Sequence, residues 1–198
     1  TLARQFAAAA YQPGEAAAPR PAAQTRRIIL LLSLCAFASA ASMRLCDPLL
    51  PVLADEFATT LSAAAATTTG FALAYGAAQL FFGALGDRFG RLAVITIAVS
   101  IAALATVASA LLPSLAGLVA GRVATGAFAA AAIPLSMAWI GDNVPFAERQ
   151  PVLARYLIGQ MLGITAGQAG GGVLAELLGW RSAFWLIALL FAGAALML

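Results

Sequence analysis

The sequence predicts an all-α membrane protein, a single bundle of six transmembrane helices. Hydrophobic residues make up 63% of the chain and charged residues 10%, whereas an average soluble domain is roughly 25% charged. The mean hydropathy is +0.95. The apolar residues fall into six long runs, and about 20 apolar residues are enough for a helix to cross a bilayer. We therefore expect lipid to surround most of this chain.

Residues 1–25 differ from the rest because they are rich in alanine, proline and glutamine and show no apolar period. This composition favours a disordered tail, which we expect in the cytoplasm. Residues 26–198 then form the transmembrane bundle. The chain starts without methionine and stops inside an apolar run, so we expect it to be an N-terminal half whose C-terminal half is missing.

The first expected span covers residues 28–50. Near its far end, Arg44 and Asp47 are three residues apart, a spacing that puts both side chains on one face of a helix. Pro48 and Pro51 follow and weaken the helix, because proline has no backbone N–H to donate.

A loop containing Asp55 and Glu56 separates the first span from the second. The second expected span covers residues 63–85, within a long stretch that has no charge. The third covers residues 92–112, and Pro113 ends it because proline disrupts a helix interior.

The remaining spans are marked by short charged segments. The fourth covers residues 115–140 and contains one charge, Arg122. A loop at 141–150 leads to the fifth span, residues 152–178, and after a short turn the sixth begins at Ser182.

The arginines predict the orientation of the bundle, because cytoplasmic loops carry an excess of positive residues. With the N-terminus in the cytoplasm, only Arg181 falls in an outside loop, and eight arginines fall inside: Arg4, Arg20, Arg26, Arg27, Arg88, Arg91, Arg149 and Arg155. We therefore expect a multi-pass protein of the plasma (inner) membrane with a cytoplasmic N-terminus.

Polar residues within the spans are unevenly distributed. Spans 1, 2, 4 and 5 contain Arg44, Asp47, Gln79, Arg122, Gln160, Gln168 and Glu176. Charges inside a bilayer are costly and usually face a cavity or a partner helix, so we expect these four spans to face a cavity. Two spans with polar residues are followed by one without, and this order occurs twice, which suggests a repeated unit of three spans. Because each unit has an odd number of spans, the second unit has the opposite orientation in the membrane, as in many secondary transporters.

The segment between spans 2 and 3 combines three charges with three glycines. It reads Gly83-Ala84-Leu85-Gly86-Asp87-Arg88-Phe89-Gly90-Arg91 and resembles the signature G-x-L-a-D-r-x-G-r-k of the major facilitator superfamily. Only the last basic position departs, because it is Leu92. The resemblance implies a conformational latch made of Gly83, Gly86, Asp87, Arg88, Gly90 and Arg91.

The residue types in this segment have different physical properties. Gly83 allows span 2 to approach another helix closely, and Gly90 permits a turn with positive φ. Asp87 lies at the C-terminal end of its helix, where a negative charge is unfavourable. It therefore needs a partner, which is either Arg91 or the N-terminus of a helix in the missing half.

Spans 4 and 5 also resemble motifs of this superfamily. Arg122-Val-Ala-Thr125-Gly126 resembles R-x-x-q-G in span 4, which implies that Arg122 faces the transport path. The alternative is that Arg122 reaches the outer surface along its flexible stem. In span 5, Gly163, Gly167, Gly171 and Gly172 match the glycines of an antiporter motif, whereas Gln168 replaces its proline. We expect these glycines and Gly126 to allow close helix packing.

Asp47-Pro48-Leu49-Leu50-Pro51 resembles the span 1 signature of drug:proton antiporters. The resemblance implies that Asp47 carries a proton or binds a positive substrate charge. The alternative is a carboxylate at the end of a helix that pairs with Arg44.

The resemblance covers residues 26–198 and implies half of a twelve-helix major facilitator fold with 3+3 inverted repeats. We expect a secondary active transporter of a small organic solute that works by alternating access, with proton-coupled efflux as the direction. Proton-coupled uptake by the same fold is the alternative, because a fold does not set direction. The path for substrate and protons would contain Asp47, Arg44, Arg122, Gln79 and Gln160.

Two rival classes fit the composition less well. A membrane enzyme needs a nucleophile with a base or paired metal ligands, and the chain has no histidine. A non-transporting scaffold or sensor would not need charges on facing spans. We expect no catalytic residue, metal site or cofactor. The expected partners are the solute, protons, the lipid bilayer and the missing C-terminal half, without nucleic acid.

Overall fold

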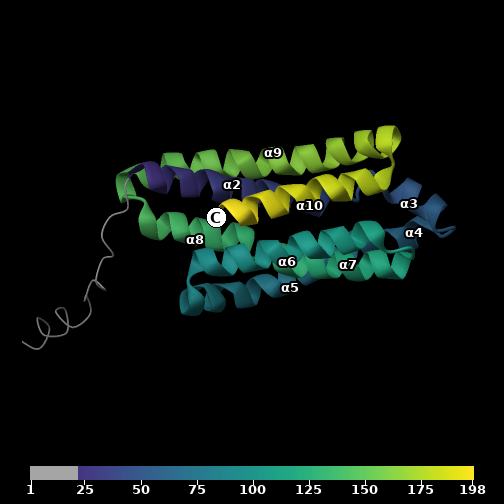
Figure 1. Cartoon of the computed structure of the whole chain (residues 1–198), viewed down its shortest axis with the longest axis horizontal. Coiled ribbons are helices and arrows are strands. Elements are labelled where there is room, and N and C mark those ends of the chain that lie inside the picture. The colour runs from purple at the N-terminus through teal and green to yellow at the C-terminus, as the bar shows by residue number, and fades with distance from the viewer. Residues whose placement is uncertain (1–21) are drawn as a thin grey trace, which may run out of the picture.

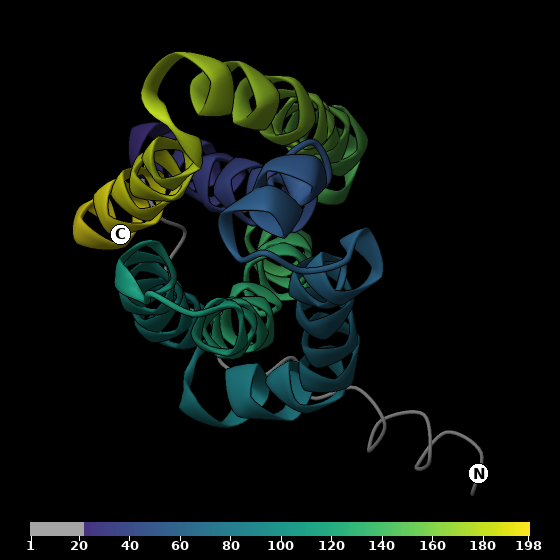
Figure 2. The same ribbon diagram turned by 90° about the vertical axis from the view of Figure 1, so that its right-hand side faces the viewer.

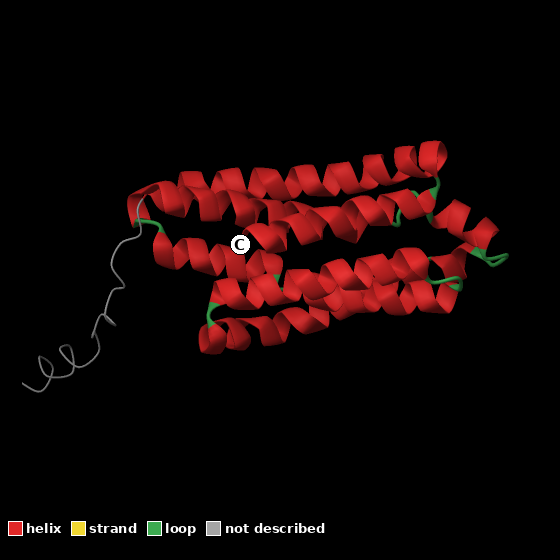
Figure 3. Cartoon of the chain, in the orientation of Figure 1, coloured by secondary structure: helices red, strands yellow, loops and turns green. Residues whose placement is uncertain are grey.

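The computed structural model describes residues 22–198, and Figure 3 shows that helices form nearly all of this part and that no strand occurs in it. Positions 1–21 of the expected tail lie outside the described residues. Helix α2 (Ala22–Arg44) begins within the expected tail, so residues 22–25 are helical.

In residues 22–198, membrane-length helical segments run back and forth along the long axis of the molecule (Figure 1). Besides α2 they are α5 (Ala66–Phe89), α6 (Arg91–Leu111), α7 (Leu115–Ala129) with α8 (Ala132–Asn143), α9 (Phe146–Leu178) and α10 (Trp180–Met197). All but α9 are long and apolar enough to span a membrane. The less apolar α9 has 33 residues, a length of about 50 Å, and lies beside α2. The molecule therefore has the expected six-span architecture.

The connections contain more helix than the sequence predicts. Asp55 and Glu56, expected in a loop, lie in α3 (Leu50–Glu56), which is followed by the short α4 (Leu61–Ala64). Pro51 occupies the first turn of α3, where a missing N–H breaks no helical hydrogen bond.

The expected loop at 141–150 is also shorter than predicted. Helix α8 continues to Asn143 and α9 begins at Phe146, so Glu148 and Arg149 are helical. Glu148 lies in the first turn of α9, where a negative charge interacts favourably with the helix dipole.

Span 4 is two helices and not one. Helix α7 ends at Ala129 and α8 begins at Ala132, with a turn at Ala130 and Ala131 between them. The hydroxyl of Ser39 on α2 donates a hydrogen bond of 3.0 Å to the carbonyl of Ala129. A side chain of span 1 therefore satisfies a carbonyl next to the break.

Three close helix pairs build the bundle: α2 with α9, α5 with α7, and α6 with α10. Figure 2 shows these helices end-on. An inverted repeat exchanges span 1 with span 4 and span 2 with span 5. Span 1 is α2 and span 5 is α9, and their counterparts in the repeat are span 4, which contains α7, and span 2, which is α5. The pair α2–α9 therefore corresponds to the pair α7–α5, as a 3+3 inverted repeat requires.

The turns at Gly90 and Gly179 also follow the repeat. They join spans 2 and 3 and spans 5 and 6, and their φ angles are +87° and +82°. Glycine adopts this region without the steric cost that a Cβ imposes. The positive φ predicted for Gly90 is therefore confirmed, and Gly179 is its counterpart at the opposite end of the bundle.

Candidate functional site

The latch segment forms a cluster of ion pairs where α5, α6 and α8 meet. Arg91 at the start of α6 lies with Nη2 3.3 Å from Oδ1 of Asp87. Its other terminal nitrogen, Nη1, forms an ion pair with Asp142 on α8. The side chains of Asp87 and Asp142 are 71% and 59% exposed, whereas that of Arg91 is 23% exposed. One arginine therefore joins two carboxylates from different helices.

Asp142 is a residue that the sequence analysis missed. Its partner Arg91 is far away in the sequence, and no motif connects the two. The sequence did contain a signal for this contact, because the loop 141–150 with Asp142 and the latch segment with Arg91 were both expected at the cytoplasmic end of the bundle. Of the two partners considered for Asp87, Arg91 forms the ion pair within this chain.

The glycines of the latch differ from one another. A Cβ on Gly83 would meet no atom within 4 Å in the described structure, so the close helix approach predicted there is absent within this chain. The close approach lies instead at Gly86, where a Cβ would collide with the side chain of Leu135 on α8 and lie 3.4 Å from Cγ of Arg91.

Arg88 stands apart from the ion-pair cluster. Its guanidinium carbon lies 5.2 Å from the ring centroid of Phe89, and among the described residues no carboxylate lies within 4.0 Å of it. Its charge is exposed. The latch therefore contains one bridging arginine and one arginine that remains accessible to other molecules.

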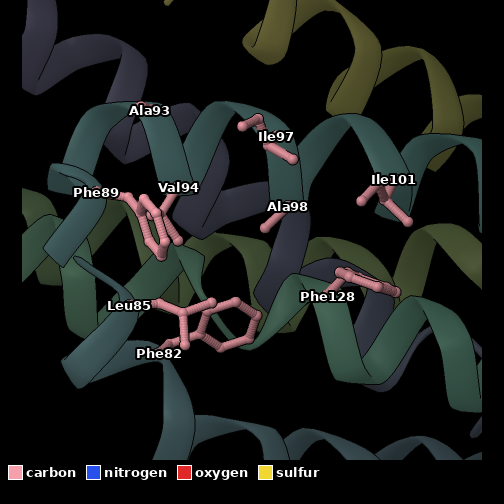
Figure 4. Close-up of a pocket in the computed structure, with 9 residues that line it drawn as sticks. All are labelled: Phe82, Leu85, Phe89, Ala93, Val94, Ile97, Ala98, Ile101 and Phe128. Atoms are coloured by element: carbon pink, nitrogen blue, oxygen red, sulfur yellow. The ribbon is translucent and has the colours of Figure 1, made fainter.

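An apolar cavity of about 380 Å³ lies beside the latch, between α5 and α6 (Figure 4). Phe82, Leu85, Ile97 and Phe128 are among its lining residues. Every lining side chain is a hydrocarbon, so this cavity offers no side-chain hydrogen bond to a polar solute.

Arg44 and Asp47 form an ion pair at the opposite end of the bundle. Nη1 of Arg44 lies 3.3 Å from Oδ2 of Asp47, and their side chains are 50% and 24% exposed. Helix α2 ends at Arg44 and a turn precedes α3. In this structure Asp47 is thus a carboxylate near a helix end that pairs with Arg44, as the second interpretation of the sequence expected.

Arg122 is fully buried between helices and does not face an open path within this chain. Its Nη1 donates a 3.0 Å hydrogen bond to Oγ of Ser42, and its Nη2 donates a 2.8 Å hydrogen bond to the Ser42 carbonyl. The guanidinium carbon lies 4.1 Å from the centroid of the Phe71 ring and 6.0 Å from that of Phe184. Arg122 therefore connects α7 to α2, α5 and α10.

Among the described residues, no carboxylate forms an ion pair with Arg122. A buried arginine that loses its water needs compensating partners. Ser42 and the Phe71 ring supply them. The sequence analysis missed Ser42 and Phe71, because hydropathy shows where a charge is buried but not which residues surround it.

The two glutamines expected in the path lie on α5 and α9. Gln79 is exposed and Gln160 is half-buried. Oε1 of Gln160 is buried and has no hydrogen-bond partner among the described residues. Gln160 therefore has an acceptor available in the bundle interior.

The glycines of span 5 bring α9 against the backbone of α2. A Cβ on Gly163 would collide with the backbone of Phe37, and one on Gly167 would collide with the backbone of Ala41. A Cβ on Gly171 would lie 2.8 Å from the Leu45 carbonyl oxygen, and one on Gly172 would lie 3.4 Å from Cβ of Pro48. In the described structure only glycine allows this approach at the first three positions.

Gly126 repeats this contact in the pair α5–α7. A Cβ there would lie 3.0 Å from Cα of Phe71 and would also collide with its carbonyl oxygen. In both helix pairs related by the repeat, glycines of one helix thus lie against the backbone of the other.

A second ion pair stabilises the end of the bundle that contains α3. Nη1 of Arg181 lies 3.0 Å from Oε1 of Glu56, and the Arg181 guanidinium carbon lies 4.2 Å from the Trp180 ring centroid. Trp180 and Phe57 contact each other edge to face, with 6.0 Å between centroids. The pair joins α3 to the start of α10, and the sequence analysis did not predict it.

A helical bundle whose helix pairs follow a 3+3 inverted repeat is an arrangement found in many secondary transporters. Residues 32–198 match the model of the Major Facilitator Superfamily. The chain therefore belongs to this superfamily.

Comparisons with individual proteins agree with the family. The chain is 33% identical over 174 residues to the uncharacterized transporter YgaY of Escherichia coli O157:H7, a match that covers 86% of this chain and 43% of YgaY. It is 29% identical to citrate exporter 1 of Aspergillus niger, covering 81% of this chain and 31% of that protein. The chain thus spans less than half the length of these relatives.

A solved structure shares the fold. The crystal structure of a D-xylose–proton symporter superposes with a TM-score of 0.67 and 18% sequence identity, covering 87% of this chain and 47% of that chain. At this identity the likeness concerns the fold alone.

Proposed function

We propose that the full-length protein exports a small organic solute by alternating access, in exchange for protons. The described bundle forms one half, and a second half of the same protein encloses the solute with it. The N-terminus lies in the cytoplasm of a cell whose plasma membrane holds the protein. The relative named as a citrate exporter supports the direction.

The observation that carries this proposal is the bridge from Arg91 to Asp87 and Asp142. Exposed ion pairs contribute only about 0–1 kcal/mol each, so they can break and form again during a transport cycle. The bridge joins three helices at the end that the arginine distribution assigns to the cytoplasm. When the cytoplasmic side opens, the carboxylates exchange Arg91 for water or for groups of the second half.

Asp47 is the proposed coupling residue. Its carboxylate is 24% exposed and pairs with Arg44, while its charge also attracts the buried Arg122. Protonation of Asp47 removes both attractions at once. A proton that enters from outside thus changes the interactions between the end of α2 and α7, and transport follows this change.

Proteoliposomes of the full-length protein test this proposal. A pH-sensitive dye inside the vesicles reports proton movement when organic acids, amines and polyols are added in turn. We expect one class of solute to drive proton flux, and Asp47→Asn to abolish this flux. Asp55→Asn, an exposed carboxylate at the same end, should leave it unchanged. Solute transport without proton movement would contradict coupling, and proton flux that accompanies solute entry would favour uptake.

A further inference from the structure

A tyrosine and a glutamine recur with the same spacing in the two spans that the repeat exchanges. Span 2 contains Tyr75 and Gln79, and span 5 contains Tyr156 and Gln160. Residues four apart lie on one face of a helix. The chain has only three tyrosines, and two of them occupy these positions.

Both pairs lie well inside their helices. Helix α5 ends and α9 begins at the same end of the molecule (Figure 1). At 1.5 Å per residue, Tyr75 lies about 21 Å along α5 from its last residue Phe89, and Tyr156 lies about 15 Å along α9 from its first residue Phe146. Each tyrosine is therefore more than two turns from that end of its own helix.

Tyr75 and Tyr156 are buried, whereas Gln160 is half-buried and Gln79 is exposed. Tyr75 lies close enough to Tyr156 to influence it electrostatically. Tyr75 also lies near Ser39 and Gln79, and Tyr156 lies near Ser136 of α8. Four helices thus contribute hydroxyl and amide groups to one place.

Several of these polar atoms lack hydrogen bonds. The hydroxyl oxygens of Tyr75 and Ser136 and Oε1 of Gln160 are buried and have no partner of acceptable geometry among the described residues. Tyr75 is 6% exposed. A buried polar group without a partner costs about 1–3 kcal/mol, and native proteins contain few such groups. Three in one cluster indicate that another molecule supplies the missing hydrogen bonds.

We propose that Tyr75, Gln79, Tyr156 and Gln160 bind the transported solute, and that this solute is uncharged and carries hydroxyl or amide groups. The proposal rests on the proposed transport function and specifies the solute. The Tyr156 hydroxyl donates to the Ile133 carbonyl at 3.4 Å and can still accept a hydrogen bond from a solute, whereas the Tyr75 hydroxyl and each glutamine amide can both donate and accept. No ionised side chain belongs to the cluster, so it offers no counter-charge to an anion or a cation.

The test measures the thermal stability of the full-length protein with small solutes that differ in charge: xylitol and acetamide as neutral probes, succinate as an anion and choline as a cation. A bound solute raises the melting temperature through mass action. We expect a shift with a neutral probe only. Tyr75→Phe and Tyr156→Phe should each weaken its binding about three- to tenfold, since each removes one neutral hydrogen bond.

Gln160→Leu and Gln168→Leu form a matched pair on α9, because Gln168 is exposed two turns further along the helix. We expect loss of binding in the first variant and none in the second. A shift with succinate or choline alone, a shift with no probe, or normal binding in both tyrosine variants would each overturn the proposal.

A transport assay separates this proposal from the proposed function. A neutral solute that binds through the cluster but does not cross the membrane in proteoliposomes refutes transport and leaves the site standing. A charged solute that is transported with protons while Tyr75→Phe has no effect refutes the site and leaves transport standing.

Discussion

The guanidinium of Arg122 donates hydrogen bonds to both the hydroxyl and the carbonyl of Ser42, across two spans and in the fully buried interior. A charge at this place is stable only because Ser42 and the Phe71 ring replace its water. The contact fixes the position of α7 relative to α2 in the half of the bundle opposite the latch.

Ser42→Ala should therefore lower the free energy of unfolding by about 1–3 kcal/mol, because one guanidinium nitrogen loses its buried acceptor. Ser33→Ala is the control, since the Ser33 hydroxyl bonds only to the Ile29 carbonyl of its own helix. Thermal unfolding of the full-length protein in detergent measures both changes. Equal stability of the two variants would show that the Arg122–Ser42 contact contributes little.

Asp142→Asn should slow the transport cycle while it changes stability by less than about 1 kcal/mol, because the lost ion pair with Arg91 is largely exposed. Glu148→Gln, a nearby exposed carboxylate at the start of α9, is the control. Rates of solute counterflow in proteoliposomes, compared with binding affinity, distinguish a slower cycle from weaker binding. A normal rate in Asp142→Asn would argue against the bridge as part of the latch.

Gly167→Ala should destabilise the bundle by about 1–3 kcal/mol, because the new methyl group collides with the backbone of Ala41 and not with a flexible side chain. Gly170→Ala should be neutral or slightly stabilising, since a Cβ at Gly170 meets no atom within 4 Å. Unfolding measurements on this pair isolate the contact between α9 and α2. Similar behaviour of the two variants would contradict the close helix approach.

Cysteine labelling tests the orientation. With the N-terminus inside, Glu56→Cys should react with a membrane-impermeant maleimide added to intact cells, and Phe146→Cys should react only after the cells are opened. Phe146 is 86% exposed and is the first residue of α9, and α9 begins at the end of the molecule opposite α3, whose last residue is Glu56 (Figure 1). The native Cys35 and Cys46 are buried, so they give little background. The reverse pattern would invert the assigned topology.

Features that depend on local chemistry could be predicted from the sequence. The apolar runs predicted the six spans because each run must cover a bilayer, and the turn at Gly90 followed from its conformational freedom. The glycines of span 5 predicted a close approach, which the structure places against α2. Boundaries were less accurate, since Glu148 and Asp55 are compatible with helix ends as well as with loops.

Features that depend on distant partners could not be predicted in the same way. Gly83 and Gly86 are equally small, and only the position of Leu135 makes the second the contact residue. Asp142 belongs to the latch because α8 brings it to Arg91, and no local pattern encodes that approach. The position of Arg122 within an apolar run predicted that it is buried, but its hydrogen bonds to Ser42 depend on how α7 packs against α2.

The break at Ala130 and Ala131 divides span 4 into helices α7 and α8. Arg122 bonds α7 to a neighbouring helix, whereas α8 carries Asp142, the partner of Arg91, near its C-terminal end. At this joint the amide of Ala131 bonds to the carbonyl of Phe128, three residues earlier and not four, while Ser39 of α2 binds the neighbouring Ala129 carbonyl. We therefore expect any bending of span 4 during the transport cycle to occur here, so that α8 tilts relative to α7.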